Sequence, residues 1–87
     1  MVTQTVRIVN PTGLHVRPAG NFCREAMKFK CKITFDYSGN LANAKSVLSV
    51  LGAGVKAEDQ ITLICDGDDE VEALEHLTRY IAEGLDM

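Results

Sequence analysis

The sequence lacks long apolar runs, paired cysteine motifs and an excess of positive charge. Its apolar runs are a few residues long, whereas a helix that crosses a bilayer needs about 20 apolar residues, and its first residues show no secretory pattern. The formal net charge is −3, which argues against a broad basic face for nucleic acid. We therefore expect a cytoplasmic protein that neither inserts into a membrane nor binds nucleic acid directly.

The cysteines are few and irregularly spaced. Cys23, Cys31 and Cys65 form no C-x-x-C pair, and three thiols cannot all be paired within one chain. This argues against a disulfide scaffold and against a structural zinc site. Each cysteine lies on an apolar stripe, so we expect small buried side chains rather than reactive thiols. We expect neither a metal nor a cofactor.

The chain is long enough for one hydrophobic core and too short for two. It has 87 residues, of which 46% are apolar, a size just above that at which small folds need disulfides or metals. We expect a single domain over residues 1–87.

Alternating apolar and polar residues predict four strands. The first covers residues 2–9, the second begins between residues 30 and 33 and ends at 37, and the others cover 41–44 and 60–65. Residues 10–13 form a turn signal, and residues 38–40 form a hairpin signal between the second and third strands. The residues expected on a solvent-exposed sheet face are Thr3, Thr5, Arg7, Thr34, Asp36 and Thr62.

Apolar residues three and four positions apart predict a first helix, with Pro18 in its first turn. Proline is accepted in a first helical turn, where its missing N–H has no partner to lose. The expected polar face of this helix carries Arg24, Glu25 and Lys28, and its apolar stripe consists of Ala19, Phe22, Cys23, Ala26 and Phe29.

Two further helices are predicted. A short one begins at Ser46 as a cap and ends at Gly52 or Gly54. The last one begins with Asp69 and Glu72 as a capping box, ends at Gly84, and has a stripe of Val71, Leu74, Leu77 and Ile81. Acidic residues favour a helix start, so we interpret the run from 66 to 72 as helix chemistry rather than as a metal site.

The element order is therefore β-α-β-β-α-β-α. Three amphipathic helices and one sheet face must share a core. This predicts an α+β fold with a mostly antiparallel four-stranded sheet that the helices cover on one face.

The junction before the first helix carries the chemistry. Gly13 permits a tight turn, and His15 and Arg17 follow at a helix N-terminus, where unpaired N–H groups and the helix dipole favour an anion such as phosphate. A neutral ring nitrogen can act as a nucleophile there. A lone histidine is more often a surface residue, and we interpret His76 in this way. No serine, cysteine or acid beside His15 suggests a hydrolytic triad.

The residues also support a family resemblance. Gly13-Leu14-His15-Val16-Arg17-Pro18-Ala19, Lys45-Ser46 and the acidic helix after Asp66-Gly67 closely resemble HPr, the histidine-containing phosphocarrier of the bacterial phosphoenolpyruvate-dependent sugar phosphotransferase system. The resemblance covers essentially the whole chain. It implies an open-faced β-sandwich with the strand order first, fourth, second, third.

The resemblance also implies a function. His15 would accept a phosphoryl group on Nδ1 from enzyme I and donate it to the IIA components of sugar permeases, and Arg17 would assist the phosphoryl group. Such a protein is not an enzyme, because it is itself the covalent phosphoryl intermediate.

Ser46 and the apolar residues after it leave alternatives open. Ser46 is either a plain helix cap or, as in HPr proteins of Gram-positive type, a site for an ATP-dependent serine kinase whose product serves a catabolite-control transcription regulator. The residues Val47, Leu48 and Leu51 form either a docking surface or part of the core. The alternative function is thus a regulatory module acting through Ser46. A small metal-binding module is a third hypothesis, but it lacks a ligand cluster.

Overall fold

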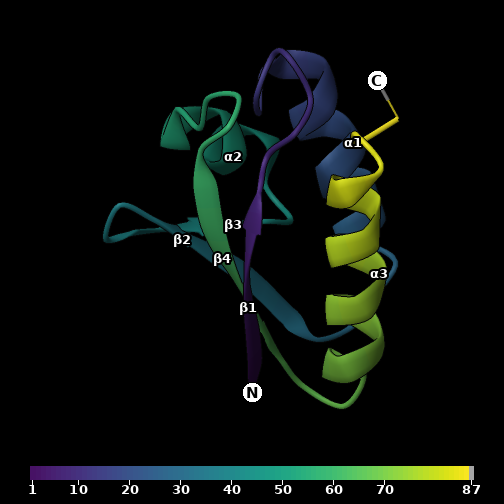
Figure 1. Cartoon of the computed structure of the whole chain (residues 1–87). Coiled ribbons are helices and arrows are strands. Elements are labelled where there is room, and N and C mark those ends of the chain that lie inside the picture. The colour runs from purple at the N-terminus through teal and green to yellow at the C-terminus, as the bar shows by residue number, and fades with distance from the viewer. Residues whose placement is uncertain (87) are drawn as a thin grey trace.

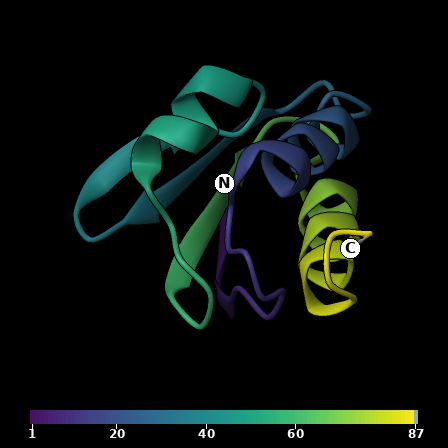
Figure 2. The same ribbon diagram turned by 90° about the horizontal axis from the view of Figure 1, so that it is seen from above.

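The protein consists of one four-stranded antiparallel sheet with three helices on one of its faces (Figures 1 and 2). The structure is a computed structural model, and it describes residues 1–86; Met87, the last residue of the expected domain, lies outside the described residues. The elements in chain order are β1 (Val2–Arg7), α1 (Val16–Ala26), β2 (Lys32–Tyr37), β3 (Asn40–Asn43), α2 (Val47–Ala53), β4 (Gln60–Asp66) and α3 (Glu70–Ala82).

The strand order is β1-β4-β2-β3, which confirms the order implied by the resemblance. Thr5 pairs with Thr62 and Phe35 pairs with Leu63. The β2–β3 hairpin turns through Ser38 and Gly39, whose φ angles are 53° and 85°. Two positive φ angles match the right-handed twist of the flanking strands, so the hairpin signal is confirmed. The third strand begins one residue earlier than expected, and β1 ends two residues earlier.

The core lies between the sheet and the helices. Alternate residues of the central strand β4, Ile61, Leu63 and Cys65, are buried against helix residues that include Phe22 and Leu77. Burying one such apolar side chain contributes about 1.5–3 kcal/mol. The opposite sheet face carries the hydroxyls of Thr5 and Thr62, which lie 2.9 Å apart, together with the apolar side chains of Ile64 and the exposed Leu41. The α+β class and the one-sided helical layer are confirmed.

The stripe of α3 differs from the prediction at one end. Val71 is 56% exposed, whereas Leu77 and Ile81 are buried as expected. Ala73 and Tyr80, which were not in the predicted stripe, are buried with them. The buried face of the helix is therefore rotated away from Val71.

The predicted capping box at the start of α3 is wrong. The carboxylate of Asp69 accepts hydrogen bonds from the backbone N–H groups of Lys30 and Cys31, at 2.8 and 2.9 Å. These bonds lower the pKa of Asp69, the bond from Lys30 most of all. Glu70, rather than Glu72, reaches back to accept from Gly67 N–H at 3.0 Å. The acidic start of α3 is therefore bonded to the two residues directly before β2.

Glu25 and His76 also depart from their predicted surroundings. Glu25 was expected on the polar face of α1, but it is buried, with 7% of its surface exposed. Its Oε1 lies 2.7 Å from Nε2 of His76 and 3.0 Å from Nζ of Lys28. His76, expected to be a plain surface residue, is half-buried and joins α3 to α1.

The cysteine prediction is confirmed for all three residues. Cys23, Cys31 and Cys65 are free and buried. Burial, followed by the contact with Asp69, raises the pKa of the Cys31 thiol to about 12. A thiol with such a pKa is almost entirely protonated at neutral pH and is a poor nucleophile.

Candidate functional site

His15 is the residue that caps the N-terminus of α1. Its backbone is extended, with φ −76° and ψ −172°, and its carbonyl accepts the first helical hydrogen bond from Ala19 N–H at 2.8 Å. The side chain is exposed and makes no capping bond. The imidazole ring therefore projects from the helix start without serving the fold.

The helix start offers unpaired donors beside this ring. Val16 and Arg17 occupy the first helical positions, where N–H groups have no intrahelical partner, and Pro18 has no N–H. Arg17 is exposed, and within residues 1–86 no salt bridge engages its guanidinium. The first turn contains no acidic residue. An anion next to His15 would thus meet two N–H groups, the positive helix end and a free guanidinium.

A close backbone contact positions the loop before His15. Leu14 N–H donates to the carbonyl of Val55 at 3.0 Å, and the Leu14 side chain is buried. Gly13 has φ +63°, and a Cβ built on it would lie 2.6 Å from the Val55 oxygen. Only glycine fits both the conformation and the space. The turn predicted at Gly13 is therefore also the point where the loop meets the segment after α2.

Asn10 is a residue that the sequence analysis treated only as part of a turn. It is 3% exposed, and its Nδ2 donates to Gly13 O at 2.7 Å and to Thr12 Oγ1 at 3.3 Å. The one signal available in the sequence was its turn-forming type. No local pattern in the sequence indicates that this amide is buried.

Ser46 caps the second helix of the site. Its hydroxyl accepts a hydrogen bond from Ser49 N–H at 3.3 Å, and α2 ends at Gly54 in the left-handed conformation. Both features match the predicted start and one of the two predicted stops. Lys45 Nζ donates to the carbonyl of Phe29 at 2.6 Å, which connects the start of α2 to the segment after α1.

The apolar residues of α2 divide between the core and the surface. Val50 is fully buried, and Leu51 is partly buried against the core. Leu48 is 83% exposed and Val47 is 38% exposed. The expected apolar patch therefore consists mainly of Leu48 and Val47, with Leu51 at its base. Because α1 and α2 pack side by side (Figure 2), this patch and the start of α1 belong to one helical layer.

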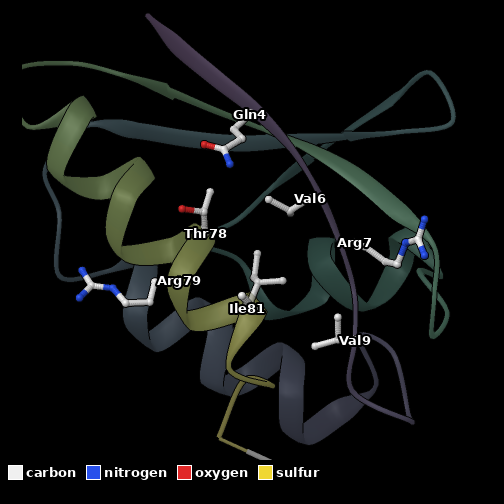
Figure 3. Close-up of a pocket in the computed structure, with 8 residues that line it drawn as sticks. Gln4, Val6, Arg7, Val9, Thr78, Arg79 and Ile81 are labelled. Atoms are coloured by element: carbon white, nitrogen blue, oxygen red, sulfur yellow. The ribbon is translucent and has the colours of Figure 1, made fainter.

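The hollow drawn in Figure 3 lies elsewhere, between β1 and α3. Gln4 and Val6 come from β1, and Thr78, Arg79 and Ile81 come from α3. None of the predicted site residues lines it. His15 is exposed and is not among the residues that line this hollow.

None of the helices in the described part of the chain is both long and apolar enough to cross a membrane. Residues 1–86 also contain no group of three or more His, Cys, Asp or Glu side chains arranged to hold a metal ion.

Comparison with known proteins gives one consistent family. The family model of the PTS HPr component phosphorylation site matches residues 2–83. The chain is 41% identical over 83 residues to the phosphocarrier protein HPr of Buchnera aphidicola, with 95% of this chain and 98% of that protein covered. It is 40% identical, with the same coverage, to the HPr-like protein Crh of Bacillus subtilis.

Solved structures agree with the sequence relatives. The crystal structure of HPr-C-His from Thermoanaerobacter tengcongensis superimposes with a TM-score of 0.96 at 36% identity. That match covers 100% of this chain and 98% of the other.

Proposed function

The chain belongs to the HPr family of phosphocarrier proteins, and from this premise we propose that His15 accepts a phosphoryl group from phospho-enzyme I and donates it to IIA components of sugar permeases. The observation that carries the proposal is the imidazole of His15 at the first turn of α1, which is exposed and makes no side-chain hydrogen bond within residues 1–86. The proposed place of action is the cytoplasm.

The chemistry requires few groups from this chain. A ring nitrogen of His15 attacks phosphorus, and the bond from phosphorus to enzyme I breaks as the new phosphorus–nitrogen bond forms. The N–H groups of Val16 and Arg17 and the guanidinium of Arg17 can donate to the phosphoryl oxygens. The helix end contributes about 0.3–1 kcal/mol, and up to about 2 kcal/mol when partly buried. This is enough to orient the group and too little to trap it.

A carrier role explains why the site is incomplete. Hydrolysis would need a positioned water and a general base, and His15 has no carboxylate, serine or cysteine within its own turn. The phosphoryl group can therefore persist until an acceptor docks. We propose that Val47, Leu48 and Leu51 form part of the surface that enzyme I and the IIA components contact, because two of these apolar side chains are exposed beside α1.

The test uses phosphoenolpyruvate labelled in its phosphate, enzyme I and the purified protein. We expect about one acid-labile phosphate per chain, and none in His15→Ala. The matched control is His76→Gln, because it alters the second histidine of the sequence and retains an amide that can bond to Glu25. Equal labelling of wild-type protein and His15→Ala would reject the proposal.

A regulatory role of Ser46 is the second candidate. It is favoured by the position of Ser46 at the N-terminus of α2, next to the exposed Val47 and Leu48. A phosphate there would lie at a favourable helix end and would place about two negative charges beside the apolar patch. The partners would be a serine kinase and a catabolite-control transcription regulator.

Two reactions separate the candidates. Incubation with ATP and an HPr serine kinase should label wild-type protein and not Ser46→Ala, with Ser49→Ala as the matched control in the same helix. Labelling at Ser46, without transfer from His15 to any IIA protein, would make the regulatory role the primary one. No label at Ser46 would remove it.

A further inference from the structure

We infer that Asn10 is a positioning residue for His15, holding the backbone that carries the imidazole in the orientation needed for phosphoryl transfer. The inference rests on the proposed function of His15. Asn10 lies between the end of β1 and the start of α1, and its side-chain amide is buried against the loop rather than exposed.

Asn10 holds both polar groups of Gly13. The carbonyl of Asn10 accepts from Gly13 N–H at 3.2 Å, and Nδ2 of Asn10 donates to Gly13 O at 2.7 Å. The second bond fixes the peptide plane between Gly13 and Leu14. Leu14 N–H in the same plane donates to Val55 O. The peptide group between Gly13 and Leu14 is thus held by Asn10 at its carbonyl and by Val55 at its N–H.

The other end of the amide is unsatisfied. Oδ1 of Asn10 is buried, and among the described residues it has no hydrogen-bond partner. An unpaired buried acceptor destabilises a fold, and such local departures are expected where geometry serves function. An apolar side chain would remove the bare Oδ1, but it would leave Gly13 O without its donor. We therefore attribute the Asn10 amide to the geometry of the loop, which its Nδ2 holds, rather than to a gain in the free energy of unfolding.

The orientation of the loop matters because no side-chain hydrogen bond holds the His15 ring in the described part of the chain. His15 makes no capping bond, so its position follows from the backbone at Leu14 and from the helix start. In reactions that depend on alignment, a misplacement of about 1 Å can lower the rate about 100-fold. Freeing the Gly13 carbonyl should therefore slow transfer while leaving the docking residues of α2 in place.

The experiment compares Asn10→Ala with Asn21→Ala. Asn21 is the matched control because its Nδ2 also donates to a backbone carbonyl, that of Leu85, at 2.9 Å. The kcat and KM for phosphorylation by phospho-enzyme I are measured together with the urea midpoint of unfolding. We expect Asn10→Ala to lower kcat about 10- to 100-fold with KM changed less than about twofold, and still to reach one phosphate per chain. Asn21→Ala should keep the wild-type kcat.

A second variant keeps the inference testable if Asn10→Ala fails to fold. Asn10→Ser retains a turn-forming residue with a hydroxyl donor, and it should recover part of the lost kcat. Unchanged kcat in Asn10→Ala, an effect confined to KM, or an equal loss in Asn21→Ala would overturn the inference. If Asn10→Ala does not fold, a wild-type kcat in Asn10→Ser would overturn it, since the shorter side chain cannot reproduce the amide. If wild-type protein takes up no phosphate, the proposed function fails and the inference fails with it. If wild-type protein is labelled and folded Asn10→Ala has the same kcat, the inference alone is rejected.

Discussion

The carboxylate of Glu25 on α1 and the imidazole of His76 on α3 lie in direct contact, with 2.7 Å between Oε1 and Nε2. The two residues are 51 positions apart in the chain. The His76 ring also stacks on Tyr80, with ring centroids 6.3 Å apart, and Lys28 approaches the same carboxylate oxygen. The buried carboxylate of Glu25 therefore connects α1, which begins after His15, to α3, the last helix of the chain.

Glu25 should make the free energy of unfolding depend on pH in the acidic range. The bond to His76, followed by the bond to Lys28, holds the pKa of Glu25 below its ordinary value of 4.5. A lowered carboxyl pKa means that the stabilisation is present above about pH 4.5 and is lost as the pH falls through the lower, folded-state value. Glu25→Gln should lose about 1–3 kcal/mol at pH 7, and less at pH 3. Urea unfolding of wild type and Glu25→Gln between pH 3 and 7 measures this difference. A difference in the free energy of unfolding that stays constant with pH would contradict the prediction.

The contact of Gly13 with Val55 gives a second prediction. Gly13→Ala should lower the free energy of unfolding by about 2–4 kcal/mol, from strain at positive φ together with overpacking against the Val55 carbonyl. Gly20→Ala is the matched control, because Gly20 lies in α1 with no atom within 4 Å of a new Cβ. That change should stabilise the protein by about 0.5–1 kcal/mol. Thermal unfolding of the two variants should therefore shift in opposite directions, and a shared direction would refute this account.

Arg17 should affect transfer rather than folding. Its side chain is exposed, so Arg17→Ala should leave the free energy of unfolding within about 0.5 kcal/mol of wild type. The loss of a charge-assisted donor to the phosphoryl group should slow transfer about tenfold or more. Arg24→Ala, on the exposed side of the same helix, serves as the control in rapid-quench measurements. An unfolded Arg17→Ala protein would show that the residue has a structural role.

The buried thiols should be protected in the folded protein. Cys31 and Cys65 are 3% and 0% exposed, and burial raises the pKa of both thiols. A disulfide reagent at pH 7.5 should label them no faster than the protein opens, whereas three thiols should react at once in concentrated urea. Cys23, the most exposed of the three at 8%, should react first. Rapid labelling of all three thiols without urea would contradict the structure.

Local patterns were sufficient for the elements and the site junction. Alternation located the strands, helical spacing located the helices, and Gly13, His15 and Pro18 located the start of α1. The errors concern residues whose partners are distant in sequence. Glu25 resembled a surface acid because nothing near it in the sequence indicates His76. Asp69 resembled a side-chain cap because its partners, residues 30 and 31, lie far from it in the sequence.

Burial that depends on helix rotation was also beyond the sequence. Val71 fits the spacing of Leu74, but the buried face of α3 carries Ala73 and Tyr80 instead of Val71. In the same way, the turn residue Asn10 is buried, with its side-chain amide bonded to the Gly13 carbonyl. Both outcomes follow from tertiary packing, which overrides local preference.

The bare imidazole and guanidinium at the start of α1 have a consequence for kinetics. Under the proposed function, His15 and Arg17 supply only part of the reacting groups, and each protein that docks would supply the others. The rate constant of phosphoryl transfer is then defined only for a pair of proteins, not for this chain alone. One substitution beside His15 would alter several pairs at once, in different proportions, so the relative flow among competing acceptors would change even where the fold does not.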